Sequence, residues 1–158
     1  QAMPVLKTFG DKVFHTGPNG TGASIKLINN MLAGINMVAT MEALVLGVKA
    51  GLSVQTIKEV IGASSGNNKV FEGLVDKILT INPEPPKGQT ANQGLHTIGK
   101  DVRLANEMAQ NLSVPLSLGS SALQPFLAGL AKGWADKEYW VIMEFFEQLS
   151  DANIRPQS

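Results

Sequence analysis

Residues 17–30 read GPNGTGASIKLINN, a polar turn with three glycines that leads directly into the most apolar helix of the sequence. Gly17, Gly20 and Gly22 permit backbone shapes and close approaches that a side chain would block. The proline and the asparagine between them favour a turn over a helix. We therefore expect a sharp, exposed helix start with Ser24 as its cap.

The helix that follows covers residues 25–50 and carries only three charges, Lys26, Glu42 and Lys49. Gly51 supplies a stop signal, because glycine readily adopts the left-handed conformation that ends helices. A helix that is apolar on every face is typical of the centre of a larger helical fold. We therefore expect it to be buried nearly all round.

Composition limits the classes of protein to consider. The chain has 158 residues, of which 44% are hydrophobic and 16% charged, as expected of one globular domain with a core. Thirteen basic and thirteen acidic residues balance, so no net field favours nucleic acid or an anionic membrane, and we expect neither as a partner. The chain has no cysteine and only two histidines, His15 and His96, so we also expect no metal site.

A membrane span is the main alternative for the apolar helix. Residues 31–48 approach the apolar length of a span, but Asn36, Thr40 and Glu42 lie within the run. A core helix explains the same pattern. The start of the chain shows no signal-peptide pattern, and we expect a cytoplasmic protein.

The remaining sequence predicts further helices separated by turn signals. Apolar residues recur at helical spacing, Ser53 and Pro115 mark helix starts, and Gly133 marks an end. Pro125 should kink its helix, since proline removes a backbone hydrogen bond. The expected elements are a helical turn at 4–9, a strand-like run at 12–15, a proline-rich loop at 82–88, and helices at 54–62, 70–79, 95–110, 115–132 and 138–149.

The glycine turn invites comparison with a phosphate-binding loop, whose pattern is GxxxxGK followed by Ser or Thr. The position of the phosphate-binding lysine holds Ala23, and Lys26 comes three residues later on a different helix face. The turn also lacks the GxGxxG pattern of a dinucleotide fold. The sequence therefore argues against a nucleotide-phosphate site in this turn.

Lys26 and Asn30 are one helical turn apart and share a face. An ammonium group desolvated on an apolar helix favours its neutral form, which can accept a proton, and Asn30 could orient a substrate oxygen. Spacing alone favours a simpler interpretation, in which Lys26 extends to solvent and Asn30 satisfies a backbone group. Likewise Lys100 and Asp101 could be a solvated charge pair.

Two segments carry a family resemblance. The pattern GxxGxGxxxKxxxN from residue 17 to residue 30, continued by NNML at 29–32, resembles the second domain of the β-hydroxyacid dehydrogenases. This family includes 3-hydroxyisobutyrate dehydrogenase and the tartronate and succinic semialdehyde reductases. Residues 99–105, GKDVRLA, resemble its second recurring segment. The resemblance implies an all-α, multi-helical domain around one long buried helix, similar to the C-terminal domain of 6-phosphogluconate dehydrogenase.

The resemblance also implies an NAD- or NADP-dependent interconversion of a small β-hydroxy acid and its oxo or semialdehyde form. Lys26 matches the catalytic general acid and base, and Asn30 matches the asparagine beside the substrate. Gly22 belongs to the turn that lets the helix start approach the substrate, and Lys100 matches a cofactor-binding lysine. Gln93 stands where many members have an aromatic residue, which leaves the substrate open.

By the same resemblance, residues 1–16 are the tail of a preceding Rossmann domain and 17–150 the helical domain. Residues 151–158, at the end of the chain, are expected to be a loose tail. The cofactor would be bound mostly by that Rossmann domain, so we expect the chain alone to be inactive. The length of the central helix and a surplus of aromatic side chains predict a homo-oligomer. The alternative is an all-helical dimerisation or interaction module without a catalytic role. The aromatic residues are Phe126, Trp134, Trp140, Phe145 and Phe146.

Overall fold

The computed structural model describes residues 5, 8, 10, 12–80 and 94–155. From residue 12 onward these form six α-helices and one short 3-10 helix, and the described residues contain no β-strand, so the expected all-α class is confirmed. The elements are α2 (Thr21–Lys49), α3 (Val54–Gly62), α4 (Lys69–Thr80), α5 (Leu95–Asn111), α6 (Ser117–Ala131), η1 (Tyr139–Ile142) and α7 (Met143–Ser150).

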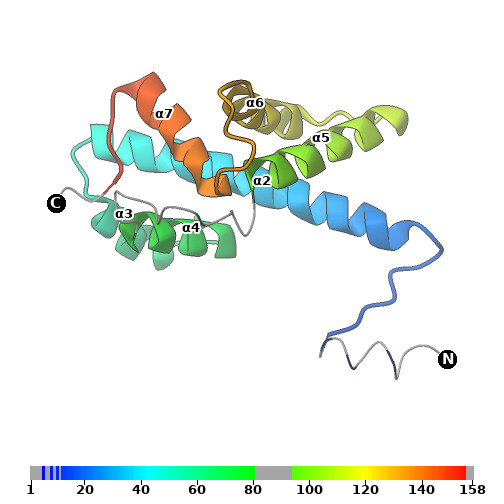
Figure 1. Ribbon diagram of the computed structural model, residues 1–158. Coiled ribbons are helices and arrows are strands. Elements are labelled where there is room, and N and C mark those ends of the chain that lie inside the picture. The colour runs from blue at the N-terminus through cyan, green and yellow to red at the C-terminus, as the bar shows by residue number, and fades with distance from the viewer. Residues whose placement is uncertain (1–4, 6–7, 9, 11, 81–93, 156–158) are drawn as a thin grey trace.

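Helix α2 is the axis of the domain. It contacts α3, α4, α5, α6 and α7, and Figure 1 shows α3 and α4 on one side of it with α5, α6 and α7 on the other. By length and composition alone α2 could cross a membrane, but the core helix of a soluble domain has the same properties. Its packing against five other helices is that of a core helix.

The expectation that α2 is buried nearly all round is wrong for its first half. The buried residues of α2 all lie between Gly34 and Val45, whereas Ile25, Ile28 and Leu32 are exposed. Figure 1 shows the reason, since the blue, N-terminal part of α2 extends beyond α3 and α4. Burial therefore depends on which neighbours reach α2, because apolar side chains such as Ile25, Ile28 and Leu32 stay exposed where α3 and α4 do not reach it.

The ends of the first two helices test the local predictions. Helix α2 begins at Thr21, with Gly20 in the left-handed conformation at φ 96° before it, so Ser24 is not its cap. The Ser24 hydroxyl instead donates back to the Gly20 carbonyl at 3.3 Å, within the first helical turns. Gly51 at φ 87° ends the helix as expected, and Ser53 caps α3 by accepting from the Thr56 amide.

The aromatic side chains do not form the surplus surface that the sequence indicated. Phe126, Trp134 and Phe146 are buried in one core with α2 residues such as Met41 and Leu44. The exposed large apolar residues are mostly aliphatic instead. Among the described residues, the exposed large apolar side chains are Ile, Leu and Val apart from Phe14.

The C-terminal segment is anchored, so the expected loose tail is wrong for residues 151–155. Ile154 is 1% exposed within the core, and its amide donates to Glu147 at 3.0 Å. Arg155 pairs with the carboxylates of Glu147 at 2.9 Å and Glu144 at 3.2 Å. A buried apolar side chain followed by a double ion pair ties this segment to α7.

Other expectations fall partly outside the described residues. Residues 12–15 are described and form no strand, contrary to the strand-like pattern. The helical turn at 4–9 lies largely outside the described residues, and the proline-rich loop at 82–88 lies entirely outside them. Pro125 is buried within α6, and the kink there stays a prediction.

Candidate active site

The site begins where α2 and α5 cross. A side chain at Gly34 would place its Cβ 2.6 Å from the Val102 methyl group, closer than real contacts allow. In α5 itself, a Cβ at Gly99 would lie 3.3 Å from the Cβ of Phe126 in α6. The two glycines therefore let α5 pack closely against both α2 and α6. Asp101, next to Val102 in α5, is thereby brought against α2 at Asn30, which lies one turn before Gly34.

Asp101 is the buried centre of this crossing. It is 2% exposed, and its Oδ2 accepts a hydrogen bond from Asn30 Nδ2 at 2.6 Å. The two residues are 71 positions apart in the sequence, so only the fold brings them together. A buried carboxylate needs such partners, because leaving it unpaired away from water is costly.

Two lysines flank the same carboxylate. Lys26 Nζ lies 3.8 Å from Oδ2, and Lys100 Nζ lies 3.7 Å from Oδ1. Both lysine side chains are more than half exposed, so these weak pairs leave them free to meet a ligand. Two positive charges around one negative charge make a locally positive site, which suits an anionic substrate or cofactor.

The structure thus brings together three of the four predicted site residues, Lys26, Asn30 and Lys100, and it corrects two simpler interpretations. Asn30 bonds to a buried side chain rather than to a backbone group, and Asp101 is not solvated. The expected desolvation of Lys26 is also wrong, since its side chain is 65% exposed where the first half of α2 is uncovered.

Gly22 is the fourth predicted site residue and lies in the first turn of α2, one turn before Lys26. A Cβ there would meet only the Thr16 hydroxyl at 3.8 Å, an ordinary contact. Glycine is required instead at Gly17 and Gly20, which have φ of 122° and 96°. The substrate-binding role of Gly22 stays a prediction, based on its place beside the lysine.

Sequence reasoning missed the structural part of the site. Asp101 entered it only as a charge beside Lys100, and Gly34 was not considered. A glycine within an apolar helix, one turn after Asn30, was the available signal of a close helix crossing. The identity of the crossing helix could not be read from the sequence, because it depends on tertiary packing.

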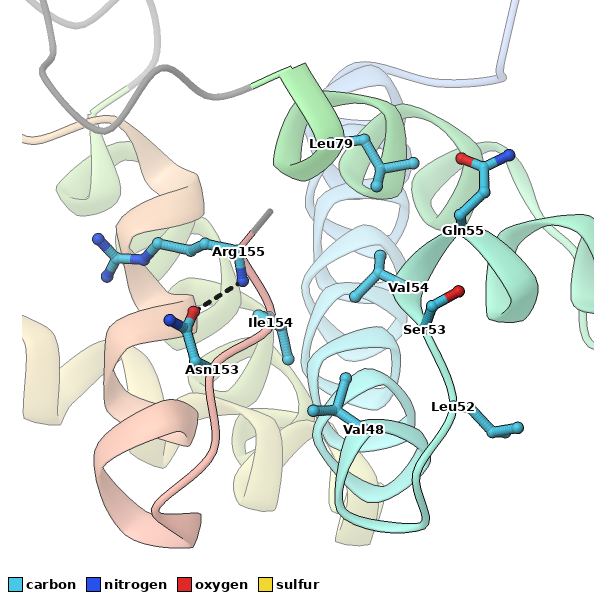
Figure 2. Close-up of a pocket in the computed structure, with 9 residues that line it drawn as sticks. All are labelled: Val48, Leu52, Ser53, Val54, Gln55, Leu79, Asn153, Ile154 and Arg155. Carbon is cyan, nitrogen blue, oxygen red and sulfur yellow. Dashed lines mark hydrogen bonds between the residues drawn. The ribbon is translucent and has the colours of Figure 1, made fainter. Parts of the chain in front are cut away.

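A hollow lies near the other end of α2, away from these lysines. It measures about 350 Å³ and is lined by Val48, Leu52, Ser53, Val54, Gln55, Leu79, Asn153, Ile154 and Arg155. Its polar groups already have partners: Ser53 caps α3, Gln55 binds Glu59, and Asn153 accepts from the Arg155 amide. Figure 2 shows the Arg155 guanidinium directed away from Val48 and Val54. The lining of this hollow is largely apolar, and its named polar groups already serve the fold.

The part of the chain that the structure describes contains no cluster of side chains that could bind a metal ion. Across residues 12–80 and 94–155, no three His, Asp or Glu side chains gather closely enough to hold a metal ion. The carboxylate of Asp101 is instead surrounded by an amide and two ammonium groups. Such a set is suited to charge and hydrogen-bond recognition.

Comparison with known proteins gives the family. Residues 20–145 match the family model described as NAD-binding of NADP-dependent 3-hydroxyisobutyrate dehydrogenase. The chain is 35% identical over 152 residues to the 2-(hydroxymethyl)glutarate dehydrogenase of Eubacterium barkeri, covering 96% of this chain and 49% of that protein. It is 32% identical over 155 residues to the NAD-dependent L-serine dehydrogenase of Pseudomonas aeruginosa, covering 93% and 50%.

A solved structure agrees with the sequence comparison. The 3-hydroxyisobutyrate dehydrogenase of Mycobacterium tuberculosis, solved with L-serine, superposes with a TM-score of 0.77 at 28% identity, covering 91% of this chain and 50% of that one. The chain spans about half the length of the relatives it matches. The cofactor of the matched family is NAD or NADP. The chain belongs to the 3-hydroxyisobutyrate dehydrogenase family of hydroxyacid dehydrogenases, and it corresponds to the all-helical NAD-binding domain of that family.

Proposed function

We propose that this chain is the C-terminal half of an NAD(P)-dependent oxidoreductase that interconverts a small β-hydroxy acid and its oxo or semialdehyde form. The observation that carries the proposal is the convergence of Lys26, Asn30 and Lys100 on the buried Asp101. These residues come from two helices and from both segments that resemble the family. An interaction module would not need two exposed lysines held around one buried carboxylate.

Lys26 is the proton-transfer residue in this proposal. In the oxidation its neutral amine accepts the substrate hydroxyl proton, and in the reduction its ammonium returns that proton to the oxygen. NAD(P), when bound, supplies the acceptor or donor of hydride at the substrate carbon. The exposure of Lys26, 65% for its side chain, leaves its Nζ able to meet a substrate at this end of α2.

Asn30 and Gly22 complete the substrate side. The Asn30 amide is fixed by its bond to Asp101 and lies one turn after Lys26, so both can meet one oxygen-bearing group. Gly22 lies one turn before Lys26 at the start of α2. The absence of a side chain there keeps the approach to the lysine open.

Lys100 suits the cofactor. Its side chain, on α5, is 52% exposed, and its ammonium group lies near Asp101 Oδ1, whereas that of Lys26 lies near Oδ2. A cation in this position can contact a negatively charged group of NAD(P). Pyrophosphate binding by a dinucleotide fold normally rests on a glycine turn and a helix N-terminus in a Rossmann domain. We therefore assign the greater part of cofactor binding to that domain as a partner.

Assembly forms a further part of the proposal. Ile25, Ile28 and Leu32 recur at helical spacing and remain exposed on the first half of α2. Apolar residues grouped in this way favour contact with another protein surface. We expect a homo-oligomer built through the helical domain, and we place the enzyme in the cytoplasm. A single monomeric species in sedimentation at tens of micromolar would contradict the assembly.

The test compares the chain alone with the two-domain protein in which a Rossmann domain precedes it. We expect the two-domain protein to reduce NAD or NADP with small β-hydroxy acids in an absorbance assay. The chain alone should unfold cooperatively but bind NAD(H) and NADP(H) at best in the millimolar range, because the glycine turn and helix N-terminus that normally bind the pyrophosphate belong to the Rossmann domain. It should show no turnover, because misplacement of the cofactor by about 1 Å can already cost roughly 100-fold in rate. Micromolar cofactor binding or clear turnover by the chain alone would show that the cofactor site is misassigned.

A further inference from the structure

Asn19 is the only asparagine of the chain that precedes a glycine. It is exposed in the turn from Pro18 to Thr21, which the Thr21 amide closes by donating to the Pro18 carbonyl at 3.2 Å. Gly20 has φ 96° and ψ −26°, close to the third position of a type II turn, and Asn19 is not among the non-glycine residues with positive φ. The turn itself therefore favours glycine directly after Asn19.

The Asn19 side chain and the Gly20 nitrogen are unrestrained. The backbone hydrogen bonds of the turn and of the start of α2 use the amides of Thr21, Ala23 and Ser24, and they leave the Gly20 nitrogen unengaged. No hydrogen bond within the described part of the chain holds the Asn19 side chain. A Cβ at Gly20 would meet nothing within 4 Å, so the surroundings leave room for the two groups to react.

Two other asparagines outside the helices are held in place. Asn67 donates to the Glu72 carboxylate at 2.7 Å. The backbone amide that follows Asn153 donates to the Glu147 carboxylate at 3.0 Å. Each is also followed by a residue with a side chain, which hinders attack by the backbone nitrogen. The combination of an exposed amide and an unhindered nitrogen is therefore found at Asn19 and not at these positions.

We propose that Asn19 is a site of spontaneous deamidation, which converts the turn before α2 to aspartyl and isoaspartyl forms. The Gly20 nitrogen gives its proton to water and attacks Cγ of Asn19. The new N–Cγ bond closes a five-membered succinimide, and Nδ2 takes up a proton and leaves as ammonia. Water then opens the ring. Opening at Cγ gives aspartate, whereas opening at the backbone carbonyl gives isoaspartate, in which the chain continues through Cγ.

The isoaspartyl form changes the start of α2. It inserts a methylene group into the backbone before Gly20, whose carbonyl accepts from the amides of Ala23 at 3.0 Å and Ser24 at 3.1 Å. From Gly20 to Lys26 is roughly 9 Å along a helix, so the distortion lies beside the candidate site. This consequence rests on the proposed function: kcat/KM of the isoaspartyl form should fall about 10- to 100-fold, the usual effect of a misplacement of about 1 Å. The aspartyl form keeps the backbone and places a negative charge favourably before a helix N-terminus.

The first experiment incubates the two-domain protein at mildly alkaline pH and follows its tryptic peptides by mass spectrometry. The peptide of residues 13–26 contains Asn19 as its single asparagine and has no glutamine. We expect it to become deamidated, in both aspartyl and isoaspartyl forms, within about tenfold of the rate of a synthetic peptide of the same sequence, because exposed turns open at almost no cost in free energy.

The internal control is the peptide of residues 27–49, whose asparagines lie within α2 and should stay unchanged. Two outcomes would overturn the proposed modification site. One is an unchanged peptide 13–26 under conditions that convert the synthetic peptide. The other is equal deamidation of the two tryptic peptides.

Asn19→Gln tests the effect on the site in the two-domain protein. Glutamine keeps the amide but must close a six-membered ring, which forms far more slowly. We expect this variant to start with wild-type kcat/KM and to keep it during incubation, while the wild type loses kcat/KM in proportion to its isoaspartyl fraction. Constant wild-type kcat/KM as isoaspartate accumulates, or an equal loss in Asn19→Gln, would overturn this effect. If no hydroxy acid is turned over but Asn19 is deamidated, the proposed function fails and the modification site stands.

Discussion

The two halves of α2 are nearly alike in composition but differ in their surroundings. In residues 34–49 the chain packs into the core, with Met41 and Leu44 fully buried. In residues 21–33 the apolar side chains of Ile25, Ile28 and Leu32 are 49%, 44% and 54% exposed. The polar residues of the candidate site, Lys26 and Asn30, belong to this uncovered half. One helix thus supplies both the core of the domain and the residues of the candidate site.

The difference arises from neighbours rather than from α2 itself. In the second half, a Cβ at Gly47 would come 2.5 Å from the Ile57 side chain of α3, so this part of α2 is tightly packed. Where the two halves meet, the close contact is with α5, at Gly34 and Asn30. Burial of apolar area contributes stability only where such neighbours exist. The first half accordingly keeps apolar side chains exposed beside the candidate site.

The largest expected effect is on kcat, and it should occur on substitution of a lysine at only one end of α2. In the two-domain protein, Lys26→Ala should lower kcat by about 10²–10⁴-fold, the usual contribution of a general acid or base. Its melting temperature should change little, because the side chain is exposed. Lys49→Ala, at the other end of the helix, removes an exposed lysine that donates to the Asp151 carbonyl and should keep kcat. Turnover of Lys26→Ala within about threefold of wild type would remove its proton-transfer role.

The second expected effect is a difference in the free energy of unfolding between variants in the two halves of α2. Met41→Ala should lower the free energy of unfolding of the chain by about 2–5 kcal/mol, because it leaves a cavity in the core. Ile28→Ala should cost much less, since 44% of that residue is already in water. Urea denaturation of each variant at low protein concentration, where any oligomer dissociates, measures the two free energies of unfolding. Equal losses of unfolding free energy in the two variants would mean that Ile28, in the first half of α2, is buried as fully as Met41.

The third expected effect lies at the boundary between the halves. Gly34→Ala should destabilise the chain by about 1–3 kcal/mol, because its methyl group meets Val102 at 2.6 Å and overpacks the crossing. Gly73→Ala is the matched control within α4, where a Cβ would meet nothing within 4 Å. That substitution should stabilise by about 0.5–1 kcal/mol through helix propensity. Thermal unfolding of both variants decides whether the crossing is as close as described, and changes of the same sign would contradict it.

The smallest expected effect probes the packing around η1. Burial, and secondarily the Glu138 carboxylate, raises the pKa of Tyr139 above 10.0. Its neutral form is therefore favoured in the folded state, so this contribution to stability is complete below pH 10.0 and is lost as pH rises through the higher folded value. Tyr139 is the chain's single tyrosine, so ultraviolet absorbance follows its titration directly. A midpoint at or below that of the unfolded chain would contradict the packing.

Much of the helical layout follows from local sequence. The helix at 54–62, its Ser53 cap and the stop at Gly51 were predicted correctly, because caps and apolar spacing act within a few residues. Ser24 failed as a cap, since the preceding glycine in the left-handed conformation started the helix earlier. The tail failed because its anchors, Ile154 and Arg155, depend on partners in other elements.

The sequence by itself determined the chemical inventory: two family-like segments containing Lys26, Asn30 and Lys100 on helices with recognisable ends. Helical spacing placed Lys26 and Asn30 on one face, because that relation depends on only one turn of backbone. The tertiary structure alone decided that Asp101 is buried between them, since its bond to Asn30 spans 71 positions. It also decided which half of α2 is core, because apolar composition states a preference for burial while only the packing of other helices can satisfy it.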